Sequence, residues 1–413
     1  MCSICGGTRW GHYSRNIWEK AQDRGRDDQG MIIGRSGGWI GNRRATPTTE
    51  VEIPTEKQPV GIVNKLVFNG IISNDDSYLK FPGEADTSVL PRVLNFTNLI
   101  AFRDSIEQKL IGSYAIAVLI EDSQEIWLAA NYKPIWIAEW EGEFFFSSLK
   151  AHFPYFMNPY RMPPYSVQSL TNRLSTIPIH RTQGHKALVI CSAGLDSTAV
   201  AAFACSTHLP ENTTLLHFDY GCQATSKEIE CIKKIALYFH CKLDIIKMTS
   251  FGGSSLLEEH GEISEGIKGA EYAHEWVPAR NLMMLAHATA YAEAKGYGHI
   301  YLGTNLEEAG AYPDNEEQFI LDFNSLLWGA VQNGTKIEIH TPLGGLMKHE
   351  IIPFGLKYNA PFELTWSCYR AGEHHCGKCG PDFMRRTAFK RNGLIDPVFD
   401  SKDPFWEGCV PCH

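Results

Sequence analysis

The chain changes its secondary-structure pattern near residue 186, and this change constrains the fold more than any other feature. Before it, short β-type runs separated by Gly- and Asn-rich turns predict mainly antiparallel sheets, with strands at 60–68, 113–120, 126–130, 135–137 and 144–147. After it, apolar strands are expected at 187–191, 215–220, 243–248 and 299–303, alternating with helices at 196–205, 227–239 and 281–295. This alternation is typical of a parallel, doubly wound sheet. We therefore predict an α+β sandwich followed by an α/β domain.

A proline-rich segment separates the two patterns. FPYFMNPYRMPPY holds four prolines and several tyrosines, which indicates a connector or boundary. We predict a first domain over 2–160, a linker over 161–185, a second domain over 186–365, and a Cys-rich segment with a tail over 366–413. A length of 413 residues fits two or three such domains.

Composition excludes several classes of protein. Hydrophobic residues make up 44% and charged residues 21%, which is ordinary for a globular chain. The formal net charge of −9 disfavours a broad nucleic-acid surface, although a local basic patch remains open. No apolar run reaches the ~20 residues that span a bilayer, and MCSICGGTRW does not read as a signal peptide. We expect a cytoplasmic location, no membrane partner, and twelve cysteines that serve as thiols, catalytic groups or metal ligands.

Cys2 directly follows the initiator methionine. Removal of that methionine would leave Cys2 with a free α-amine, a group that titrates near pH ~8 and can act as a general base. The thiolate would then be the nucleophile, with no need for a separate histidine. Alone, a cysteine at this position is more often incidental, so the surrounding motifs decide its interpretation.

Several ordered motifs make the first part of the chain similar to the class II glutamine amidotransferase domain of asparagine synthetases. MCSICG matches the opening of that family, and DRGRDDQG resembles its HRGPDxxG with Arg26 in place of Pro. The match continues through SYAIAV, YKPIW and FSSLKAHF to about residue 153. The resemblance implies an N-terminal nucleophile hydrolase in which Cys2 attacks glutamine and releases ammonia.

The same resemblance assigns residues around the nucleophile. Asn69 and Gly70 in FNGIISN match the oxyanion-hole pair, in which an amide side chain and a backbone N–H stabilise the tetrahedral intermediate. Ile71 stands where asparagine synthetases have Glu. Arg44 aligns with the arginine that holds the glutamine carboxylate, and Asp86 with the residue that binds the α-ammonium. An ordinary surface pair is the alternative for these two.

A second motif, SAGLDST, follows the expected strand 187–191 and opens a helix. Backbone N–H groups at such a turn can hold phosphate oxygens, and the expected contacts are Ser192, Ala193, Gly194, Leu195, Asp196 and Ser197. The pattern resembles SGGxDS of ATP-pyrophosphatases, which implies ATP cleavage between the α- and β-phosphates, substrate adenylation, and Asp196 near Mg²⁺. Since alanine tolerates positive φ poorly, Ala193 in place of the second glycine predicts an altered local geometry. A capped strand–turn–helix without phosphate is the alternative.

Later motifs are similar to 7-cyano-7-deazaguanine synthases of the queuosine pathway, from about residue 186 to residue 390. HFDYGCQ resembles the strand-end YGQ of that family with Cys222 inserted, and WVPARN resembles its VPGRN with Ala279 in place of Gly. GAYPDN resembles its SGYPDC. The predicted contacts of a deazaguanine base are Arg280, Asn281, Tyr312 and Asp314. A carboxylate such as Asp314 can accept two hydrogen bonds from a guanine-like edge.

Two further groups of residues follow from the same resemblance. In PLGGLMKHEII, Lys348 is expected to meet phosphate charge and Glu350 to support the site. The family binds structural zinc with four cysteines, and here Asp382 stands at the fourth position. The predicted zinc ligands are Cys368, Cys376, Cys379 and Asp382. The alternatives for the fourth ligand are Cys409, Cys412 and His413, which otherwise form a tail with free thiols.

Four functions compete, and we expect the first. The first is glutamine-dependent transfer of ammonia to C7 of a 7-cyano-7-deazaguanine in tRNA or DNA, which gives an amidine and resembles the archaeal fused enzymes that make archaeosine. The second is an ATP-dependent synthase that converts free 7-carboxy-7-deazaguanine to the nitrile. The third is an asparagine-synthetase-like ligase, against which YPDN and the cysteine cluster argue. The fourth is a non-catalytic nucleic-acid-binding module, which the retained Cys2 and Asn69 disfavour.

ATP separates the first two functions. Adding ammonia to a nitrile needs no ATP, whereas making a nitrile from a carboxylate does, so the phosphate loop favours the second. Ala193 and Ala279 favour the first, because they indicate a relaxed ATP site. The expected partners are glutamine and a 7-deazaguanine base, with Zn²⁺, ATP and Mg²⁺ as cofactors. The sequence does not decide whether the acceptor of the ammonia is a free base, tRNA or DNA, or whether the chain forms a homo-oligomer.

Overall fold

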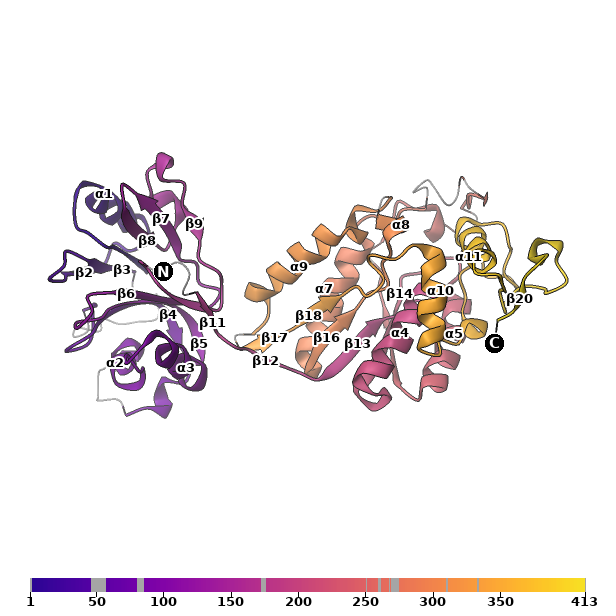
Figure 1. The fold of residues 1–413 in the computed structure, drawn as a ribbon, viewed down its shortest axis with the longest axis horizontal. Coiled ribbons are helices and arrows are strands. Elements are labelled where there is room, and N and C mark those ends of the chain that lie inside the picture. Colours follow the sequence, from indigo (N-terminus) through magenta and orange to yellow (C-terminus); the bar gives the residue numbers. More distant parts are fainter. Residues whose placement is uncertain are drawn as a thin grey trace. The chain divides into compact units, whose positions relative to one another are not determined.

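The computed structural model describes residues 2–45, 57–79, 85–171, 176–249, 251–258, 261–266, 268, 275–309, 311–332 and 334–412. The chain divides into two compact units (Figure 1). The first comprises Met1–Thr182 with Gln332–Gly334, and the second comprises Gln183–Val331 with Thr335–His413. In neither unit does a described helix have the length and apolar character that crossing a membrane requires.

The first unit contains two antiparallel sheets, as predicted. One has the strand order β2-β3-β1-β8-β7-β9 and the other has the order β11-β10-β6-β5-β4. The strands of the first sheet are β1 Ser3–Gly7, β2 Asp28–Ile33, β3 Trp39–Arg44, β7 Trp136–Trp140, β8 Glu143–Ser147 and β9 Tyr160–Arg161. Those of the second are β4 Lys65–Ile72, β5 Gly112–Leu119, β6 Ile126–Ala130, β10 Ser166–Ser169 and β11 Ile177–Pro178. The helices are α1 His12–Lys20, α2 Leu90–Val93 and α3 Leu99–Lys109.

The two sheets of this unit pack face to face on an apolar core. Alternate side chains of each sheet meet there, including Ile4 and Ile40 from one sheet and Val67 and Leu128 from the other. A buried side chain also joins the sheets, because Asn42 Nδ2 donates to the carbonyl of Phe68 at 3.0 Å. This bond holds β4 against β3, which pairs with β1 directly after Cys2.

The segment 161–185, which the sequence indicates as a linker, contributes strands to the first unit. β10 pairs with β6, and β11 pairs with β10. All four residues of β10 are buried. Its sequence, SVQS, holds one apolar residue, so neither alternation nor hydrophobicity marks it as a strand.

The second unit is built on a parallel sheet with the strand order β15-β14-β13-β16-β18, which confirms the predicted fold class. The strands are β13 Lys186–Ile190, β14 Thr213–Asp219, β15 Lys242–Lys247, β16 Tyr297–Tyr301 and β18 Glu338–His340. The helices are α4 Leu195–His208, α5 Thr225–Phe239, α7 Arg280–Lys295, α8 Leu306–Ala309, α9 Glu317–Ala330, α10 Lys348–Lys357 and α11 Gly380–Arg391.

Helices cover both faces of this sheet (Figure 1). Ala187 and Val189 of β13 pack toward α4, α5 and α10, whereas Leu188 and Ile190 pack toward α7 and α9. The strand order reverses at β13, because the chain runs outward through β14 and β15 and then returns to β16 on the other side. In such sheets ligands bind outside the carboxyl ends of the strands at the point of reversal.

Candidate functional site

Cys2 and Asn69 are the predicted centre of the first unit. Cys2 directly precedes β1 and is half-buried, and its Sγ lies 3.8 Å from the carbonyl oxygen of Ala45. Asn69, on β4, is 4% exposed, and within the described part of the chain its Nδ2 has no hydrogen-bond partner. A buried amide donor that is left unpaired suits an oxyanion that forms during a reaction.

Gly70 and Asp86 are fixed by β4 and its neighbours. A Cβ on Gly70 would lie 1.8 Å from the carbonyl oxygen of Ser113 on β5, so the close approach of the strands requires glycine. Asp86 Oδ2 accepts a hydrogen bond from the backbone N–H of Ile72 at 2.9 Å. This bond ties the predicted ammonium-binding carboxylate to the same end of β4 as Gly70.

Arg44 is the last residue of β3, and its carbonyl accepts from the backbone N–H of Asp27 at 3.0 Å. Arg44 belongs to the segment IGNRRATPT, residues 40–48, of which residues 46–48 lie outside the described residues. The described chain therefore places the backbone of Arg44 at the end of a central strand, and its predicted contact with the glutamine carboxylate stays a prediction.

The phosphate loop keeps a left-handed residue where the sequence has alanine. Ala193 has φ 64° and is fully buried, and its carbonyl accepts from Trp366 N at 2.8 Å. Ala279, before α7, has φ 54°. Both alanines thus adopt the left-handed conformation that glycine permits, at a cost of about 1–2 kcal/mol each, and a difference from the loop geometry of the family stays a prediction. Tertiary contacts such as the one with Trp366 offset that cost.

The turn after Ala193 leads directly into α4. Gly194 is the N-cap of this helix, and Ser197 Oγ accepts from Ser192 N at 3.2 Å and donates to the Gly194 carbonyl at 3.3 Å. The loop is therefore braced by its own serine. Free N–H groups at the start of a helix favour an anion there.

A charged cluster lies beside the loop. Lys348 Nζ is 2.5 Å from Asp196 Oδ2 and 3.2 Å from Glu308 Oε1, and Asn305 Nδ2 donates to the same Asp196 oxygen at 3.3 Å. Burial raises the pKa of the Asp196 carboxyl to about 6, and Lys348 opposes that rise. Asp196 Oδ1 is buried and, among described atoms, without a hydrogen-bond partner. Lys348, the predicted phosphate contact, is thus paired with two carboxylates in this structure.

Two adjoining cavities occupy the carboxyl end of the sheet. They share Arg280, Glu308, Lys348, Tyr369 and Pro381. The larger has a volume of about 200 Å³ and is lined by the phosphate loop and by Leu302, Gly303 and Thr304 after β16. The smaller, of about 80 Å³, is lined by four carboxylates and several aromatic rings. We call the larger the loop cavity and the smaller the aromatic cavity.

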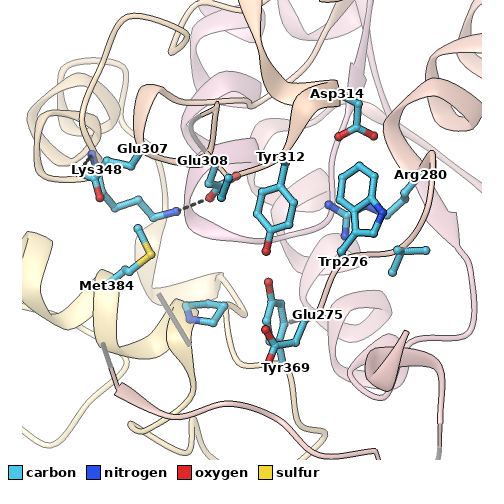
Figure 2. A pocket seen from close by; sticks show the side chains of 13 residues that line it. Glu275, Trp276, Arg280, Glu307, Glu308, Tyr312, Asp314, Lys348, Tyr369 and Met384 are labelled. Carbon is cyan, nitrogen blue, oxygen red and sulfur yellow. Dashed lines mark hydrogen bonds and ion pairs between the residues drawn. The ribbon is translucent and has the colours of Figure 1, made fainter. Parts of the chain in front are cut away.

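The aromatic cavity contains the predicted base contacts Arg280, Tyr312 and Asp314 (Figure 2). Trp276 and Tyr312 are stacked, with ring centroids 5.6 Å apart and planes inclined by 14°. The hydroxyl groups of Tyr312 and Tyr369 point toward one another in Figure 2. The wall is thus apolar on its ring faces and polar at its ends, which suits a planar heterocycle.

Asp314 and Asn281 are engaged with each other. Asp314 Oδ2 accepts from the backbone N–H of Asn281 at 3.0 Å, at the start of α7. Asn281 Nδ2 donates to Asn315 Oδ1 at 2.5 Å. Burial raises the pKa of Asp314, while the Asn281 N–H and Arg280 oppose that rise. One oxygen of the predicted base-binding carboxylate therefore stabilises a helix N-terminus.

The four predicted metal ligands come together. One ligand atom from each of Cys368, Cys376, Cys379 and Asp382 lies within 4.8 Å of the others. The described tail cysteines are not part of this group, and His413 lies outside the described residues. Backbone N–H groups of Arg370 and Cys376 each approach Cys368 Sγ at 3.5 Å. Such bonds favour a thiolate.

His375 supports this cluster and was not singled out from the sequence. Its Nδ1 lies 2.8 Å from Asp382 Oδ1, and its Nε2 lies 3.3 Å from the Thr365 carbonyl. A bonded imidazole of this kind orients a carboxylate ligand. The adjacent His374, Cys376 and Cys379 in HHCGKC are the signal that marks the region as metal-binding.

Sequence reasoning also missed Glu275, Glu308 and Tyr369. All three line the aromatic cavity, from segments about 30 to 60 residues apart. Glu308 lies in α8 before the YPDN motif, Tyr369 follows Cys368, and Glu275 precedes WVPARN. Their adjacency to motifs is the available signal, and it does not reveal which side chain enters the cavity.

Comparison with known proteins divides the chain at the same place. The family model described as "Queuosine biosynthesis protein QueC" matches residues 186–393. The 7-cyano-7-deazaguanine synthase of Saccharolobus solfataricus is 40% identical, with 93% of this chain and 94% of that protein covered. The enzyme of the same name from Sulfolobus acidocaldarius is 38% identical, with 92% and 93% covered. The synthase of Koribacter versatilis is 35% identical and covers 53% of this chain and 95% of itself.

Solved structures resemble the chain more remotely. A glutamine phosphoribosylpyrophosphate amidotransferase from B. subtilis has 15% sequence identity and a TM-score of 0.34, with 59% of this chain and 65% of that chain covered. This likeness is too low to carry a functional argument. The relatives of similar length therefore carry the comparison.

Proposed function

Because the chain belongs to the 7-cyano-7-deazaguanine synthase family, we propose that it converts free 7-carboxy-7-deazaguanine to the nitrile with ATP. Relatives of that name align over more than nine-tenths of this chain. Making a nitrile from a carboxylate and ammonia removes two molecules of water, and each loss requires an activated oxygen. The observation that carries the proposal is the wall shared by the loop cavity and the aromatic cavity. It allows a bound carboxyl group and an ATP phosphate to meet.

In this proposal the phosphate loop and Lys348 hold ATP. The contacts are the backbone of 192–197 and the start of α4, which favour anions. Lys348 exchanges part of its pairing with Asp196 and Glu308 for phosphate oxygens. Asp196 Oδ1, a buried oxygen without a hydrogen-bond partner in the described chain, is suited to Mg²⁺, which prefers carboxylate and phosphate ligands. Mg²⁺ would neutralise charge on the phosphates.

The aromatic cavity would hold the base. Tyr312 with Trp276 provides a stacking surface, and Arg280 and Asp314 provide polar contacts. Asn281 acts on the base indirectly, because its N–H and side chain fix Asp314 and Asn315. This arrangement would place the substituent at C7 toward the shared wall.

The first unit would supply the ammonia from glutamine. We assign Cys2 as nucleophile, Asn69 and Gly70 as the oxyanion hole, and Arg44 and Asp86 as the contacts of the glutamine carboxylate and ammonium. The unpaired Nδ2 of Asn69 supports this assignment most directly. The family model matches residues 186–393, beyond the first 182 residues, and the Koribacter versatilis synthase aligns with about half of this chain.

Formation of an amidine on a 7-cyano base within tRNA or DNA is the second candidate. The first unit, most of which lies outside the residues 186–393 that the family model matches, favours it. Relatives named as synthases nevertheless align across both units, and the braced phosphate loop suits a reaction that needs ATP. ATP dependence therefore separates the two candidates.

Mass spectrometry of the products tests the choice directly. The full chain is offered free 7-carboxy-7-deazaguanine, free 7-cyano-7-deazaguanine, and the cyano base in tRNA or DNA, each with glutamine and with or without ATP. We expect 7-carboxy-7-deazaguanine to be converted to the nitrile only in the reactions that contain ATP as well as glutamine. Amidine formed in nucleic acid without ATP, with no nitrile from the carboxylate, would reverse the assignment.

The cluster of Cys368, Cys376, Cys379 and Asp382 fits zinc. Three thiolates and one carboxylate are an accepted donor set for tetrahedral Zn²⁺, and the backbone N–H groups and His375 complete their surroundings. Zinc would supply structural cohesion to the segment around Tyr369 and α11. Elemental analysis should find about one zinc per chain. A fully folded chain that contains no metal would refute the assignment.

A further inference from the structure

Glu275 is a buried carboxylate in the wall of the aromatic cavity. The residue is 3% exposed and directly precedes Trp276, one of the stacked rings. In the view of Figure 2, Glu275 and Asp314 lie at opposite ends of the drawn residues. Both carboxylates line the aromatic cavity.

The position of Glu275 is fixed by hydrogen bonds. Its carbonyl accepts from Ser254 Oγ at 3.3 Å, and Oε1 of its side chain accepts from Ser264 N at 2.7 Å. Ser254 is itself buried. The side chain is thus held at one oxygen, so the second oxygen has a defined place rather than a range of rotamers.

That second oxygen, Oε2, is buried and has no hydrogen-bond partner within the described residues. The other carboxylates of the cavity are engaged: Glu307 accepts from Lys348 N at 2.9 Å, Glu308 pairs with Lys348, and Asp314 accepts from Asn281 N. A buried acceptor without a donor is costly to a protein. A ligand that brings an N–H group to Glu275 would remove this cost.

We propose that Glu275 Oε2 accepts a hydrogen bond from the amidine-like edge of the bound base, formed by N1–H and the 2-amino group, and so selects guanine-type over hypoxanthine-type bases. This inference rests on the proposed function for the identity of the base. A guanine-like edge presents two adjacent N–H donors, whereas the analogue without the 2-amino group presents one. Glu275 is thus a specificity-determining residue that contacts the substrate away from the reacting carbon.

Binding measurements with two bases test this role without turnover. Isothermal titration calorimetry on the full chain would give the Kd of 7-cyano-7-deazaguanine and of its analogue that lacks the 2-amino group. We expect the wild-type chain to prefer the 2-amino base by about 10- to 100-fold, the range for one hydrogen bond to a charged group. In Glu275→Gln this preference should fall close to unity, because the amide NH₂ would face the donors of the base.

Two further variants separate recognition from folding. Glu275→Leu has no acceptor and should show the same loss of preference, provided that its thermal midpoint confirms folding. Glu316→Gln removes an exposed carboxylate at the N-cap of α9 and should keep the wild-type preference. Equal weakening of both bases in Glu275→Gln, an unchanged preference, or a wild-type chain that does not discriminate would overturn the inference.

The outcomes also distinguish this inference from the proposed function. A chain that binds the 2-amino base selectively through Glu275 but forms no nitrile contradicts the proposed reaction alone. A chain that forms the nitrile without discrimination between the two bases contradicts the role of Glu275 alone. A chain that binds neither base contradicts the inference.

Discussion

In the first unit, the buried side chain assigned to the reaction, Asn69, is neutral and its Nδ2 is unpaired among the described residues. In the second unit, Asp196 and Lys348 are charged and lie 2.5 Å apart. An unpaired neutral donor costs about 1–3 kcal/mol to bury, which is less than an unpaired charge costs, and its hydrogen bond becomes stronger when an oxyanion forms beside it. Charged groups need compensation before the ligand arrives. Under the proposed function, the first site would stabilise a charge created by its own reaction, whereas the second would exchange its ion pairs for those of a ligand that is already charged.

Replacement of the nucleophile gives the largest expected effect and tests whether the two sites are separable. Cys2→Ala should lower glutamine-dependent nitrile formation by at least about a thousandfold, because the attacking thiol is lost. Turnover with ammonium salts and the thermal midpoint should stay unchanged, since Cys2 is half-buried at the end of β1. Coupled chromatography and mass spectrometry would measure both activities. If Cys2→Ala used glutamine as fast as the wild-type chain does, the first unit would have no part in the reaction.

Loss of the central lysine should affect the second unit in both stability and activity. Lys348→Met leaves the partly buried Asp196 carboxylate and the Glu308 carboxylate, whose side chain is 32% exposed, without their cation, so the free energy of unfolding should fall by about 2–3 kcal/mol, less than for a fully buried pair. Ammonium-dependent turnover should also be lost. Urea titration measures the first effect.

A matched control for Lys348 comes from an exposed ion pair. Lys234→Met breaks the contact with Glu230 on the surface of α5 and should leave the urea midpoint unchanged. If Lys348→Met were as stable as the wild-type chain, the charges of the second site would not need compensation, and the contrast between the units would fail.

Glu228 tests the cost of a buried charge without a cation of the kind that Asp196 has. It is a carboxyl group of the loop cavity and has no lysine partner among the described residues. Burial raises its pKa from 4.5 to about 7, and Arg280 opposes the rise. The folded state therefore holds this proton more tightly than the unfolded state. Its contribution to stability is complete below pH 4.5 and is lost as the pH rises through about 7, with a total on the order of 3 kcal/mol. Glu228→Gln should flatten this part of the pH profile, as measured by urea unfolding at pH 5, 6 and 7.5. If the free energy of unfolding of Glu228→Gln depended on pH as that of the wild-type chain does, ionisation of Glu228 would cost the folded state no stability.

The smallest expected effect concerns the two left-handed alanines. Ala193→Gly and Ala279→Gly should each raise the free energy of unfolding by about 1 kcal/mol, because glycine adopts positive φ without strain. The control is Ala290→Gly, an exposed position inside α7, which should lower it by about 1 kcal/mol. Equal losses in all three variants would show that φ at 193 and 279 carries no strain.

Sequence patterns predicted the parts of the molecule that local chemistry controls. The strand at 126–130 and the alternation after residue 186 follow from apolar periodicity, and β6 matches the prediction at both ends. Cys368 and Asp382 could be grouped because the resemblance to the synthase family aligns them with its zinc ligands, and the structure brings them together. The strand β10 could not be recognised, since its polar side chains are buried by tertiary packing.

Only some of the residues that line the cavities were predicted, because tertiary packing decides which side chains enter them. Motif residues such as Tyr312 and Asp314 were found, whereas Glu275 and Tyr369 enter the same cavity from distant segments that carry no periodic signal. The conformation of Ala193 was also beyond local reasoning. Propensity argues against φ 64°, and the contact with Trp366 that holds it comes from more than 170 residues away.

The four-residue cluster and the aromatic cavity share backbone. Tyr369 follows Cys368, and Pro381 and Met384 lie in α11, which begins directly after Cys379; all three line the cavity. Because an ion in the cluster and a base in the cavity would bind one element of structure, any change that one makes in the affinity of the other must be returned by the same factor. Where the two are coupled, metal supply would act as an effector of nucleobase affinity, and a saturating base would shift the equilibrium of the metal between the chain and a chelator.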